Sequence, residues 1–402
     1  MKPKPIPSGR APKSISPKNR LVLWVRAGGR CEYVGCNKPL LGDIVSGSEK
    51  LNKAFVAHIV AADPKGPRGD PLRSHALADS LENVMLLCHP HHHLIDEEDE
   101  PGHPEARLVE MKAVHEARIA KLTGIAPTRG SHVLHFASRI GAHDCLVTRG
   151  HSDAALLPER YPLDRSPIQL EIVGTDYRDD EPAYWALQVD TLRRQFDRLV
   201  AERRRTGDIA HLSAFAIGPQ PLLIELGRLL SDIADVEVHQ RSREPVGWTW
   251  REDGDPIDFI VERPAEPAGK VVALSLGISA QIDQQRIFDV LGTDVQIWTV
   301  RAVRPGNDIL RRRGCLARFR NEMRNVYRDI HFAHGGDAVI HIFPAVPVAM
   351  AVEIGRVWMP KANPSLVVYD EHRGLGGFVA RLEIGAPRVR LATSRLTDDA
   401  VA

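Results

Sequence analysis

Two closely spaced pairs of zinc-ligand residues constrain how the first quarter of this chain can fold. Cys31 and Cys36 are separated by four residues in RCEYVGC, and Cys88 and His91 are separated by two in LCHPHH. Two such pairs, one in a turn and one at the start of a helix, predict a tetrahedral structural zinc site. Bound zinc would stabilise a segment whose own apolar core is too small to do so. His89 lies beside the second pair and is an alternative fourth ligand.

The composition is that of a globular protein with room for two or three domains. The chain has 402 residues, of which 43% are hydrophobic and 26% are charged. Five cysteines are too few for a disulfide framework, and no apolar run reaches the roughly 20 residues of a membrane span. The N-terminus lacks the apolar region of a signal peptide, so we expect a cytoplasmic protein. The first thirty residues carry eight Lys or Arg and no acid, which suits either phosphate contacts or a disordered tail.

The hydrophobic pattern changes character after the first quarter of the chain. Residues 19–123 form the Cys/His-bearing unit and end in a helix-like segment, and residues 124–131 are predicted to be a linker. In residues 132–402, apolar strand-like runs alternate with amphipathic helices. This alternation predicts βαβ units and parallel sheets, so the fold class is α/β.

The C-terminal part also repeats itself. Residues 207–243 resemble residues 336–373, with ELGR in the first copy matching EIGR in the second at an offset that stays within 128–130 residues. Shared polar residues at a nearly constant offset indicate an internal duplication rather than two unrelated α/β segments. We therefore expect two halves, about 165–275 and 280–385, that meet about a pseudo-two-fold axis with a cleft between them.

Four polar residues near the zinc pairs suggest hydrolytic chemistry. His58 interrupts the apolar strand AFVAHIV, and Asn83 lies in LEN, nine residues before His92. His92 and Asp96 are four residues apart, so on a helix they would project from one face and could bind one divalent metal. A histidine on the opposing strand could then deprotonate a water molecule.

The order His58, Asn83, His92 around this C-x4-C and C-x2-H pattern resembles the HNH endonucleases, the ββα-metal nucleases. The resemblance implies a zinc-stabilised treble-clef domain in which His58 is the general base and Asn83 orients the loop that carries it. It also implies that His92 ligates a catalytic Mg²⁺ or Mn²⁺, with Asp96 where a second helix ligand often lies. Many members carry a further metal ligand just before the base. Here that residue is Ala57, so we expect metal binding to be weaker or to be completed by waters.

An acidic run follows the predicted metal ligands. Residues 96–100 read DEEDE. The simplest interpretation of residues 97–100 is a solvated face. The alternative is that these acids repel DNA or brace a neighbouring subunit until the protein is activated.

The segment HIFPAVPVAMAVEIGRVWMPKANPSLVVYD, and more broadly residues 165–385, resembles the SAVED domain, a fused pair of CARF-like Rossmann halves. SAVED domains sense cyclic oligonucleotides in bacterial CBASS anti-phage systems, where HNH–SAVED fusions are a known effector arrangement. The resemblance implies a largely nonspecific double-stranded DNA endonuclease that is activated by a cyclic di- or trinucleotide and acts in abortive infection. Ligand binding is expected to drive homo-oligomerisation to a dimer or tetramer.

The ligand contacts are predicted from position alone. Parallel α/β sheets bind ligands at the carboxyl ends of their strands, and aromatic side chains stack on bases. Each aromatic candidate could instead belong to the core. The candidates are Ser275, Gly277, Ser279, Trp248, Trp250, Pro344, Pro347 and Tyr369.

Two other functions remain open from the sequence. The first is a modification-dependent restriction endonuclease whose C-terminal part reads altered DNA, and the second is a zinc-stabilised binding protein without catalysis. The net charge of the whole chain is only +1, and a DNA-reading module would carry a basic face, which disfavours the first alternative. The set of His58, Asn83 and His92 disfavours the second.

Overall fold

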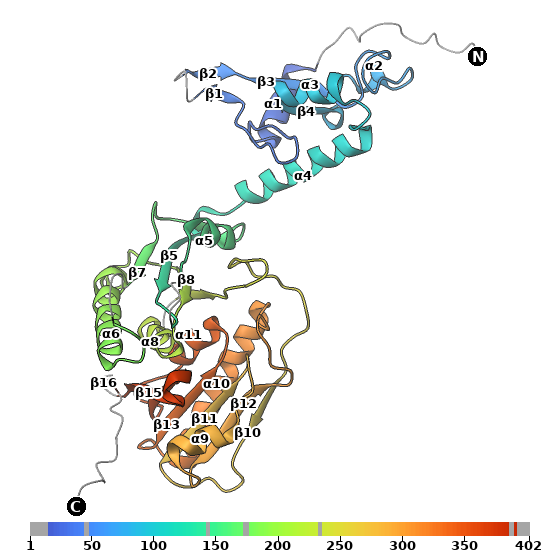
Figure 1. Ribbon diagram of the computed structural model, residues 1–402. Helices are drawn as coiled ribbons and strands as arrows, with labels where there is room; N and C mark the ends of the chain where they lie inside the picture. The colour runs from blue at the N-terminus through green and yellow to red at the C-terminus, as the bar shows by residue number, and fades with distance from the viewer. Residues whose placement is uncertain are drawn as a thin grey trace, which may run out of the picture. The chain divides into compact units, whose positions relative to one another are not determined.

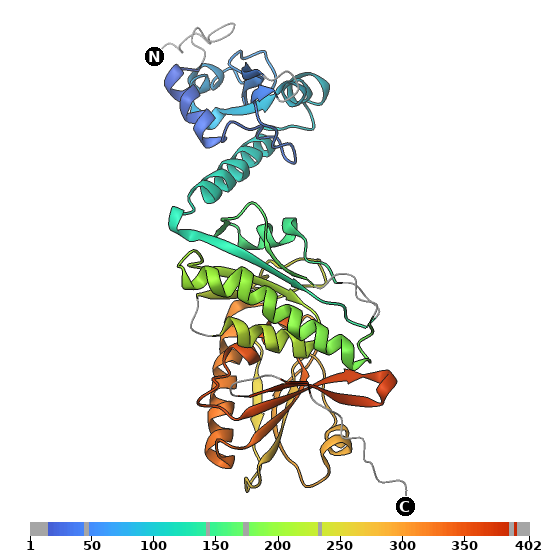
Figure 2. The same cartoon turned by 90° about the vertical axis from the view of Figure 1, so that its left-hand side faces the viewer.

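The chain folds into two compact units in a computed structural model, Met1–Ala126 (unit 1) and Pro127–Ala402 (unit 2), shown in Figures 1 and 2. The residues described by the structure are 15–43, 48–141, 145–171, 177–231, 235–385 and 390–391. Within these ranges no helix is long and apolar enough to cross a membrane. The boundary between the units falls inside the predicted linker. The end of that linker was predicted wrongly, because Gly130 and Ser131 already belong to a strand.

Unit 1 is built around an antiparallel hairpin that is followed directly by a helix. Its elements are α1 (Pro17–Arg26), β1 (Leu41–Asp43), β2 (Ser48–Asn52), β3 (Ala54–His58), α2 (Ser74–Leu77), η1 (Leu81–Asn83), β4 (Val84–Cys88), α3 (His89–His93), η2 (Leu94–Glu98) and α4 (Glu105–Thr123). β3 pairs with β4 so that Ala54 lies opposite Cys88 and His58 opposite Val84. All five residues of β4 are buried, which matches its uninterrupted apolar sequence. The hairpin and α3 therefore place the candidate catalytic histidines on neighbouring elements.

The first half of unit 2 is a parallel sheet with helical connections. After η3 (Pro127–Arg129) its elements are β5 (Gly130–Ala137), α5 (Arg149–Leu156), β6 (Tyr161–Pro162), β7 (Ile168–Glu171), α6 (Pro182–Phe196), η4 (Asp197–Ala201), α7 (Glu202–Arg205), β8 (Leu212–Ile217), α8 (Gln220–Leu230) and β9 (Val236–His239). The strand order is β6-β5-β8-β9, with β7 also paired to β5, and every pairing is parallel.

The second half has the same core with added edge strands. Its elements are β10 (Phe259–Glu262), β11 (Val271–Gly277), α9 (Gln284–Leu291), β12 (Gln296–Ala302), α10 (Arg313–His334), β13 (Val339–Ala345), α11 (Val348–Arg356), β14 (Ser365–His372), η5 (Arg373–Leu375), β15 (Gly377–Ile384) and β16 (Arg390–Leu391). The order is β10-β12-β11-β13-β14-β15-β16. The four strands β12-β11-β13-β14 are parallel, and the outer pairings are antiparallel. In Figure 2 the β14–β15 hairpin (red) projects from this sheet.

The predicted boundaries of the two halves, about 165–275 and 280–385, need correction. The first half begins with β5, which lies before residue 165, and β11 belongs to the second sheet although it lies before residue 280. The repeat was visible only over the last strand–helix–strand unit of each half, where the offset is nearly constant. Earlier in each half the connections differ in length, so the equivalence of β5 and β11 does not appear at that offset.

The two halves meet along α8 and α11, which lie side by side in Figure 1. A Cβ atom added at Gly227 of α8 would overlap the carbonyl oxygen of Val352 in α11. One added at Gly355 of α11 would overlap the carbonyl oxygen of Ile224 in α8. These contacts are reciprocal at an offset of 128 residues, as a pseudo-two-fold axis requires. The conserved spacing of ELGR and EIGR within this chain thus reflects two helices whose backbones touch.

Equivalent buried ion pairs flank this α8–α11 seam. Glu225 accepts hydrogen bonds from Arg228 at 2.7 Å and from Arg193 of α6 at 2.9 Å. Glu353 accepts one from Arg356 at 2.7 Å and lies 3.9 Å from Arg320 of α10. Both glutamates are buried, and charges in such surroundings require paired partners. The two halves therefore share polar contacts as well as topology.

Gly227→Ala is expected to destabilise unit 2 by about 3 kcal/mol, because the added methyl group meets backbone that cannot rotate away. Urea unfolding followed by tryptophan fluorescence would measure this, since five of the six tryptophans lie in unit 2. Gly314→Ala in α10 is the control, because its Cβ meets nothing within 4 Å and the change favours the helix. Equal losses in both variants would contradict the close approach of α8 and α11.

Candidate functional site

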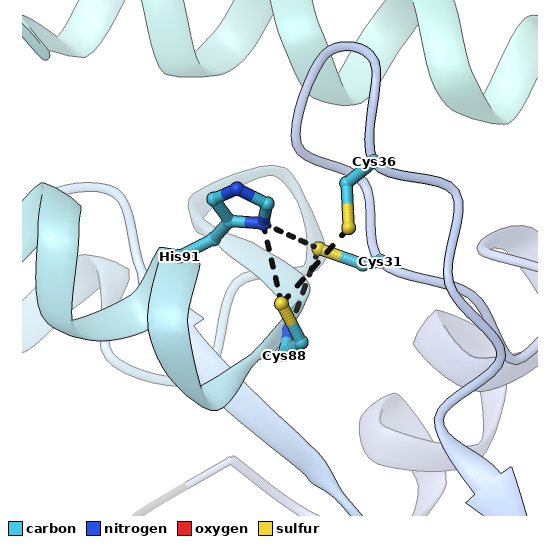
Figure 3. A group of neighbouring side chains, drawn as sticks. All are labelled: Cys31, Cys36, Cys88 and His91. Carbon is cyan, nitrogen blue, oxygen red and sulfur yellow. Dashed lines mark hydrogen bonds between the residues drawn. The ribbon is translucent and has the colours of Figure 1, made fainter.

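Four potential zinc ligands come together in unit 1 (Figure 3). Cys31 and Cys36 come from the turn after α1, Cys88 ends β4, and His91 lies in α3. Their ligand atoms all lie within 4.8 Å of one another, and in the described part of the chain they form the one such group of three or more. The four residues are those predicted from the sequence.

The distances between these atoms fit a tetrahedral zinc site. His91 Nδ1 lies 3.2 Å from Cys88 Sγ and 3.6 Å from Cys31 Sγ, and Cys36 Sγ lies 4.0 Å from Cys88 Sγ. Around zinc with ordinary Zn–S and Zn–N bonds, neighbouring ligand atoms are about 3.5–3.8 Å apart. The alternative ligand His89 instead packs its ring against Phe55, with centroids 5.3 Å apart.

Two residues not predicted from the sequence hold the histidine ligand in place. The ring of Tyr33 stacks on His91 with centroids 4.1 Å apart, and its hydroxyl lies 3.0 Å from His103 Nε2. His103 Nδ1 donates to the carbonyl of Asp99, so Nε2 is the acceptor for the tyrosine. Burial, with the nearby charge of Lys38, lowers the pKa of His91. Its imidazole is therefore neutral at neutral pH, the form that binds a metal.

His58 ends β3 with one ring nitrogen committed to a hydrogen bond. Its Nε2 lies 3.0 Å from the carbonyl oxygen of Ala78. Because a carbonyl only accepts, the proton of the neutral ring is on Nε2, and Nδ1 keeps a free lone pair. His58 is half-buried. This tautomer is the one that a general base acting through Nδ1 requires.

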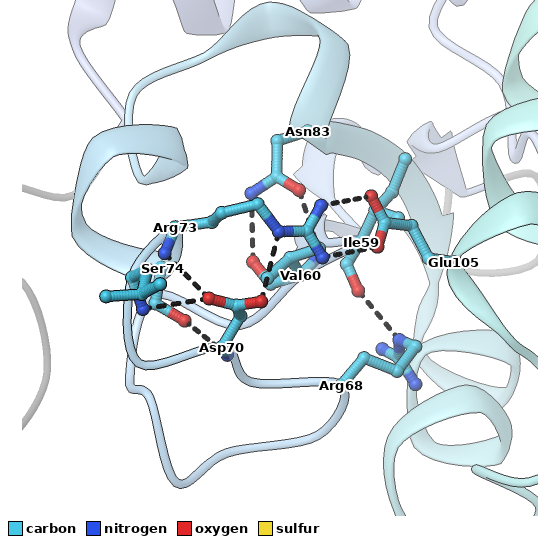
Figure 4. A network of polar contacts seen from close by, with 9 residues as sticks. Ile59, Val60, Arg68, Asp70, Arg73, Ser74, Asn83 and Glu105 are labelled. Atoms are coloured by element: carbon cyan, nitrogen blue, oxygen red, sulfur yellow. Dashed lines mark hydrogen bonds and ion pairs between the residues drawn. The ribbon is translucent and has the colours of Figure 1, made fainter.

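Asn83 fixes the backbone that follows His58 (Figure 4). Its Oδ1 accepts from the amide of Val60 at 2.8 Å, and its Nδ2 donates to the Val60 carbonyl at 2.9 Å and to the Leu77 carbonyl at 3.2 Å. Asn83 is 4% exposed, so these bonds form away from bulk water. A residue that orients the loop behind His58 has to bind the backbone of that loop, and Asn83 does so through these hydrogen bonds.

His92 and Asp96 lie on α3 and on the π-helical turn that follows it. His92 Nε2 is 3.5 Å from Asp96 Oδ2, and the His92 ring stacks on Phe55 with centroids 5.1 Å apart. One imidazole and one carboxylate oxygen suit a hard divalent ion such as Mg²⁺ or Mn²⁺. Ala57 is fully buried and supplies no ligand from the strand. The site therefore offers two protein ligands and leaves the remaining positions to water or substrate.

The acidic run after His93 divides into two parts. Glu97 and Glu98 have mostly exposed carboxylates that lie 3.1 and 3.4 Å from the two nitrogens of His93. Glu100 instead accepts from the amide of Arg68, and Asp99 accepts from the amide of Gly102. Asp99 is exposed like Glu97 and Glu98, so three of the four acids form the predicted solvated face and only Glu100 is partly buried.

Three of the residues predicted to contact a ligand in unit 2 are buried in the core. Trp248 is fully buried and meets Phe215 edge to face, with centroids 5.5 Å apart. Tyr369 stacks on Phe343 at 4.3 Å and is 4% exposed, and Ser275 is equally buried in the middle of β11. Their contacts in this structure are with neighbouring core side chains and strands.

Four of the other five candidates lie near the carboxyl ends of strands, whereas Trp250 lies in the segment between β9 and β10. Ser279 follows β11 and donates its amide to the Ala345 carbonyl of β13 at 2.7 Å. Gly277 ends β11, and Pro347 is the residue before α11. Pro344 and Pro347 are buried, and Trp250 is half-buried against the core. Ser279 alone among the candidates presents a partly exposed polar side chain at this edge.

A cavity of about 390 Å³ opens where β5 and β14 end. It is large enough for a nucleotide-sized group. Two arginines, a histidine and Tyr177, which is 46% exposed, give it cationic and aromatic groups suited to phosphates and bases, whereas Tyr184 is buried and Asp179 adds a carboxylate. The sequence offered only the strand-end position of Arg139 as a signal. The lining residues are Arg139, Gly141, Tyr177, Arg178, Asp179, Tyr184 and His372.

Two parallel-stranded halves, fused in one chain and joined at a reciprocal helix seam, define unit 2 as a duplicated Rossmann-like domain. Residues 192–384 match the model of the SAVED family, described as the "SMODS-associated and fused to various effectors sensor domain". Unit 2 therefore carries a SAVED sensor domain. The match begins within α6 and extends through β15, so it includes the whole second half.

Solved structures with related architecture have low identity to this chain. The Acinetobacter baumannii Cap4 SAVED/CARF-domain containing receptor with the cyclic trinucleotide 3′3′3′-cAAA is 11% identical, with a TM-score of 0.41. The same receptor with 2′3′3′-cAAA is 12% identical, with a TM-score of 0.42. Each match covers 70% of this chain but only 60% of the receptor, so this chain spans less than two thirds of the receptor's length. A search of curated proteins found no match.

Proposed function

We propose that this protein is a DNA endonuclease of the HNH type whose activity is switched on when its SAVED domain binds a cyclic oligonucleotide. The observation that carries the nuclease assignment is the geometry around His58. Its Nε2 is committed to Ala78, the backbone behind it is fixed by Asn83, and His92 and Asp96 lie on the neighbouring helix. The SAVED match supports the sensor role.

In the proposed mechanism His58 Nδ1 takes a proton from the attacking water. Asn83 holds the backbone that follows His58, so that the imidazole of His58 keeps its orientation during the reaction. When bound between His92 and Asp96, a divalent ion supplies stabilisation of charge on the phosphate and on the leaving 3′-oxygen. The Cys31, Cys36, Cys88 and His91 cluster fixes the end of β4 and the start of α3, and thereby positions His92 relative to the hairpin.

The substrate is double-stranded DNA cut with little sequence preference. In this proposal the activator occupies the cavity at the ends of β5 and β14, and its binding assembles SAVED domains so that nuclease units pair. A homo-oligomer is therefore the active form, and the biological role is abortive defence against phage. Mg²⁺ or Mn²⁺ serves at the catalytic site and zinc at the cysteine cluster.

The direct test is plasmid cleavage in Mg²⁺ by the purified protein, alone and with a panel of cyclic di- and trinucleotides. We expect cleavage only when one member of the panel is present. Cleavage without any ligand, or only of modified DNA, would instead support the modification-dependent restriction enzyme. The absence of cleavage under every condition would leave a zinc-stabilised binding protein.

Arg178→Ala is expected to raise the half-activating ligand concentration about tenfold without changing the maximal rate, since it removes one charged contact to a phosphate. Arg178 lines the cavity with a 77% exposed side chain 3.5 Å from Asp180. Arg194→Ala is the matched control, because Arg194 is 79% exposed, pairs with Asp190 and lies on α6 outside the cavity. Equal shifts in both variants would place the activator elsewhere.

A further inference from the structure

Arg68 connects the two catalytic elements of unit 1. It lies in the loop between β3 and α2, and its side chain is only 8% exposed. Its Nε donates to the Ile59 carbonyl at 2.7 Å, as Figure 4 shows, and its Nη1 donates to the Ile95 carbonyl at 2.6 Å. Its Nη2 donates to Asp96 Oδ1 at 2.6 Å. One guanidinium thus joins the residue after His58 to the helical turn that carries Asp96.

The backbone of Arg68 is held as firmly as its side chain. Its φ of 55° is in the left-handed region, which a non-glycine residue adopts only when its surroundings impose it. Its amide donates to Glu100 Oε1 at 2.6 Å. These contacts fix where the charge of Arg68 sits relative to the candidate metal ligands.

That charge opposes the binding of a second cation. Asp96 is the one anionic ligand at the site, and Arg68 already neutralises it, while His92 contributes no charge when it binds a metal. The strand offers no further anion, because Ala57 occupies the position just before His58. The set of His92, Asp96 and Arg68 therefore has a net charge near zero, which is unfavourable for holding a divalent ion.

We propose, resting on the proposed nuclease function, that Arg68 is a built-in counter-cation that makes metal binding at His92 and Asp96 depend on DNA. Without DNA the guanidinium occupies one oxygen of Asp96 and keeps metal affinity low. A phosphate from DNA supplies the missing negative charge, so metal and substrate bind together. Arg68 is a positioning residue in this scheme, because it acts through Asp96 and the backbone next to His58 and does not touch the reacting atoms.

The test is a Mn²⁺ titration of the full-length, zinc-loaded protein without DNA, followed by electron paramagnetic resonance. We expect Arg68→Met, which keeps the length but removes the charge, to bind Mn²⁺ about tenfold more tightly than the wild type. Arg68→Lys keeps the charge and should stay close to the wild type. His92→Ala removes one of the two proposed ligands, so the Mn²⁺ that this variant still binds measures binding elsewhere on the protein. At saturating Mn²⁺, Arg68→Met should cleave DNA at least tenfold more slowly, because the backbone next to His58 loses its tether.

A merely structural arginine would give a different pattern. If Arg68→Met binds Mn²⁺ no more tightly than the wild type, or if the Met and Lys variants change affinity equally, the counter-cation role is overturned. Should Arg68→Met fail to fold, Arg68→Gln replaces it, since glutamine is also neutral and can still donate to the Ile59 carbonyl. The titration needs no cleavage, so tighter Mn²⁺ binding by an Arg68→Met protein that cuts no DNA would support the counter-cation role of Arg68 while refuting the nuclease.

Discussion

His58→Ala is expected to lower the rate of activated DNA cleavage by about 10²–10⁴-fold, the range by which a positioned general base accelerates proton transfer. The structure provides the reason, because the bond from Nε2 to Ala78 leaves Nδ1 as the free base. Single-turnover cleavage of a labelled duplex at saturating activator and Mg²⁺ would measure the change. The binding of DNA should be unaffected, since His58 is proposed to act on the attacking water.

The matched control is His93→Ala, one residue from the proposed metal ligand His92 but turned toward Glu97 and Glu98 at the surface. It should cleave at the wild-type rate. Asn83→Ala should lose activity by disturbing the backbone behind His58. A full rate for His58→Ala would show that another group activates the water and would refute the assignment of the base.

Cys88→Ser is expected to unfold unit 1, because a structural zinc site of this kind contributes on the order of 10 kcal/mol to folding. Cys88 contacts the other ligands through Sγ, and its amide donates to Cys31 Sγ at 3.4 Å. The measurements are zinc content by atomic absorption and limited proteolysis. Zinc should fall from one ion per chain to none, and unit 1 should become protease-sensitive while unit 2 stays resistant.

Cys145→Ser is the control for this experiment. Cys145 lies in unit 2, outside the four-ligand group, so its replacement should keep one zinc ion per chain and full protection of unit 1. Retention of zinc by Cys88→Ser would mean that the cluster does not hold the ion. A chelator that unfolds unit 1 of the wild type would independently support the structural role.

Residue spacing was enough to predict that Cys31, Cys36, Cys88 and His91 come together, and that His58 and Asn83 lie near one another. Zinc ligands repeat at short intervals that the coordination geometry imposes, and an isolated histidine in an apolar strand is a strong signal by itself. The repeat also placed Gly227 and Gly355 at matching positions in the two copies, although it did not predict that α8 and α11 touch there. These features can be read from the local sequence, because metal coordination and close helix packing require particular residue types at particular spacings.

Other features depend on contacts between distant residues. Arg68 reaches Asp96 across 28 positions, and neither residue type nor spacing distinguishes it from a surface arginine. Trp248 and Tyr369 follow or lie in strands near ligand-binding edges, yet the neighbouring rings bury them. Tyr33 was not predicted because its stacking on His91 exists only once the two zinc pairs have met. Tertiary packing decides each of these cases.

The reciprocal seam between α8 and α11 has an evolutionary consequence. In a dimer of identical chains, every change on the symmetry axis appears twice, and a ligand bound there meets the same group from both sides. Fusion removed that constraint here. The position of Gln220, whose amide donates to the Val346 carbonyl, is held in the other copy by Val348. The two sides of the seam therefore differ in polarity at this position, while their glycines remain paired.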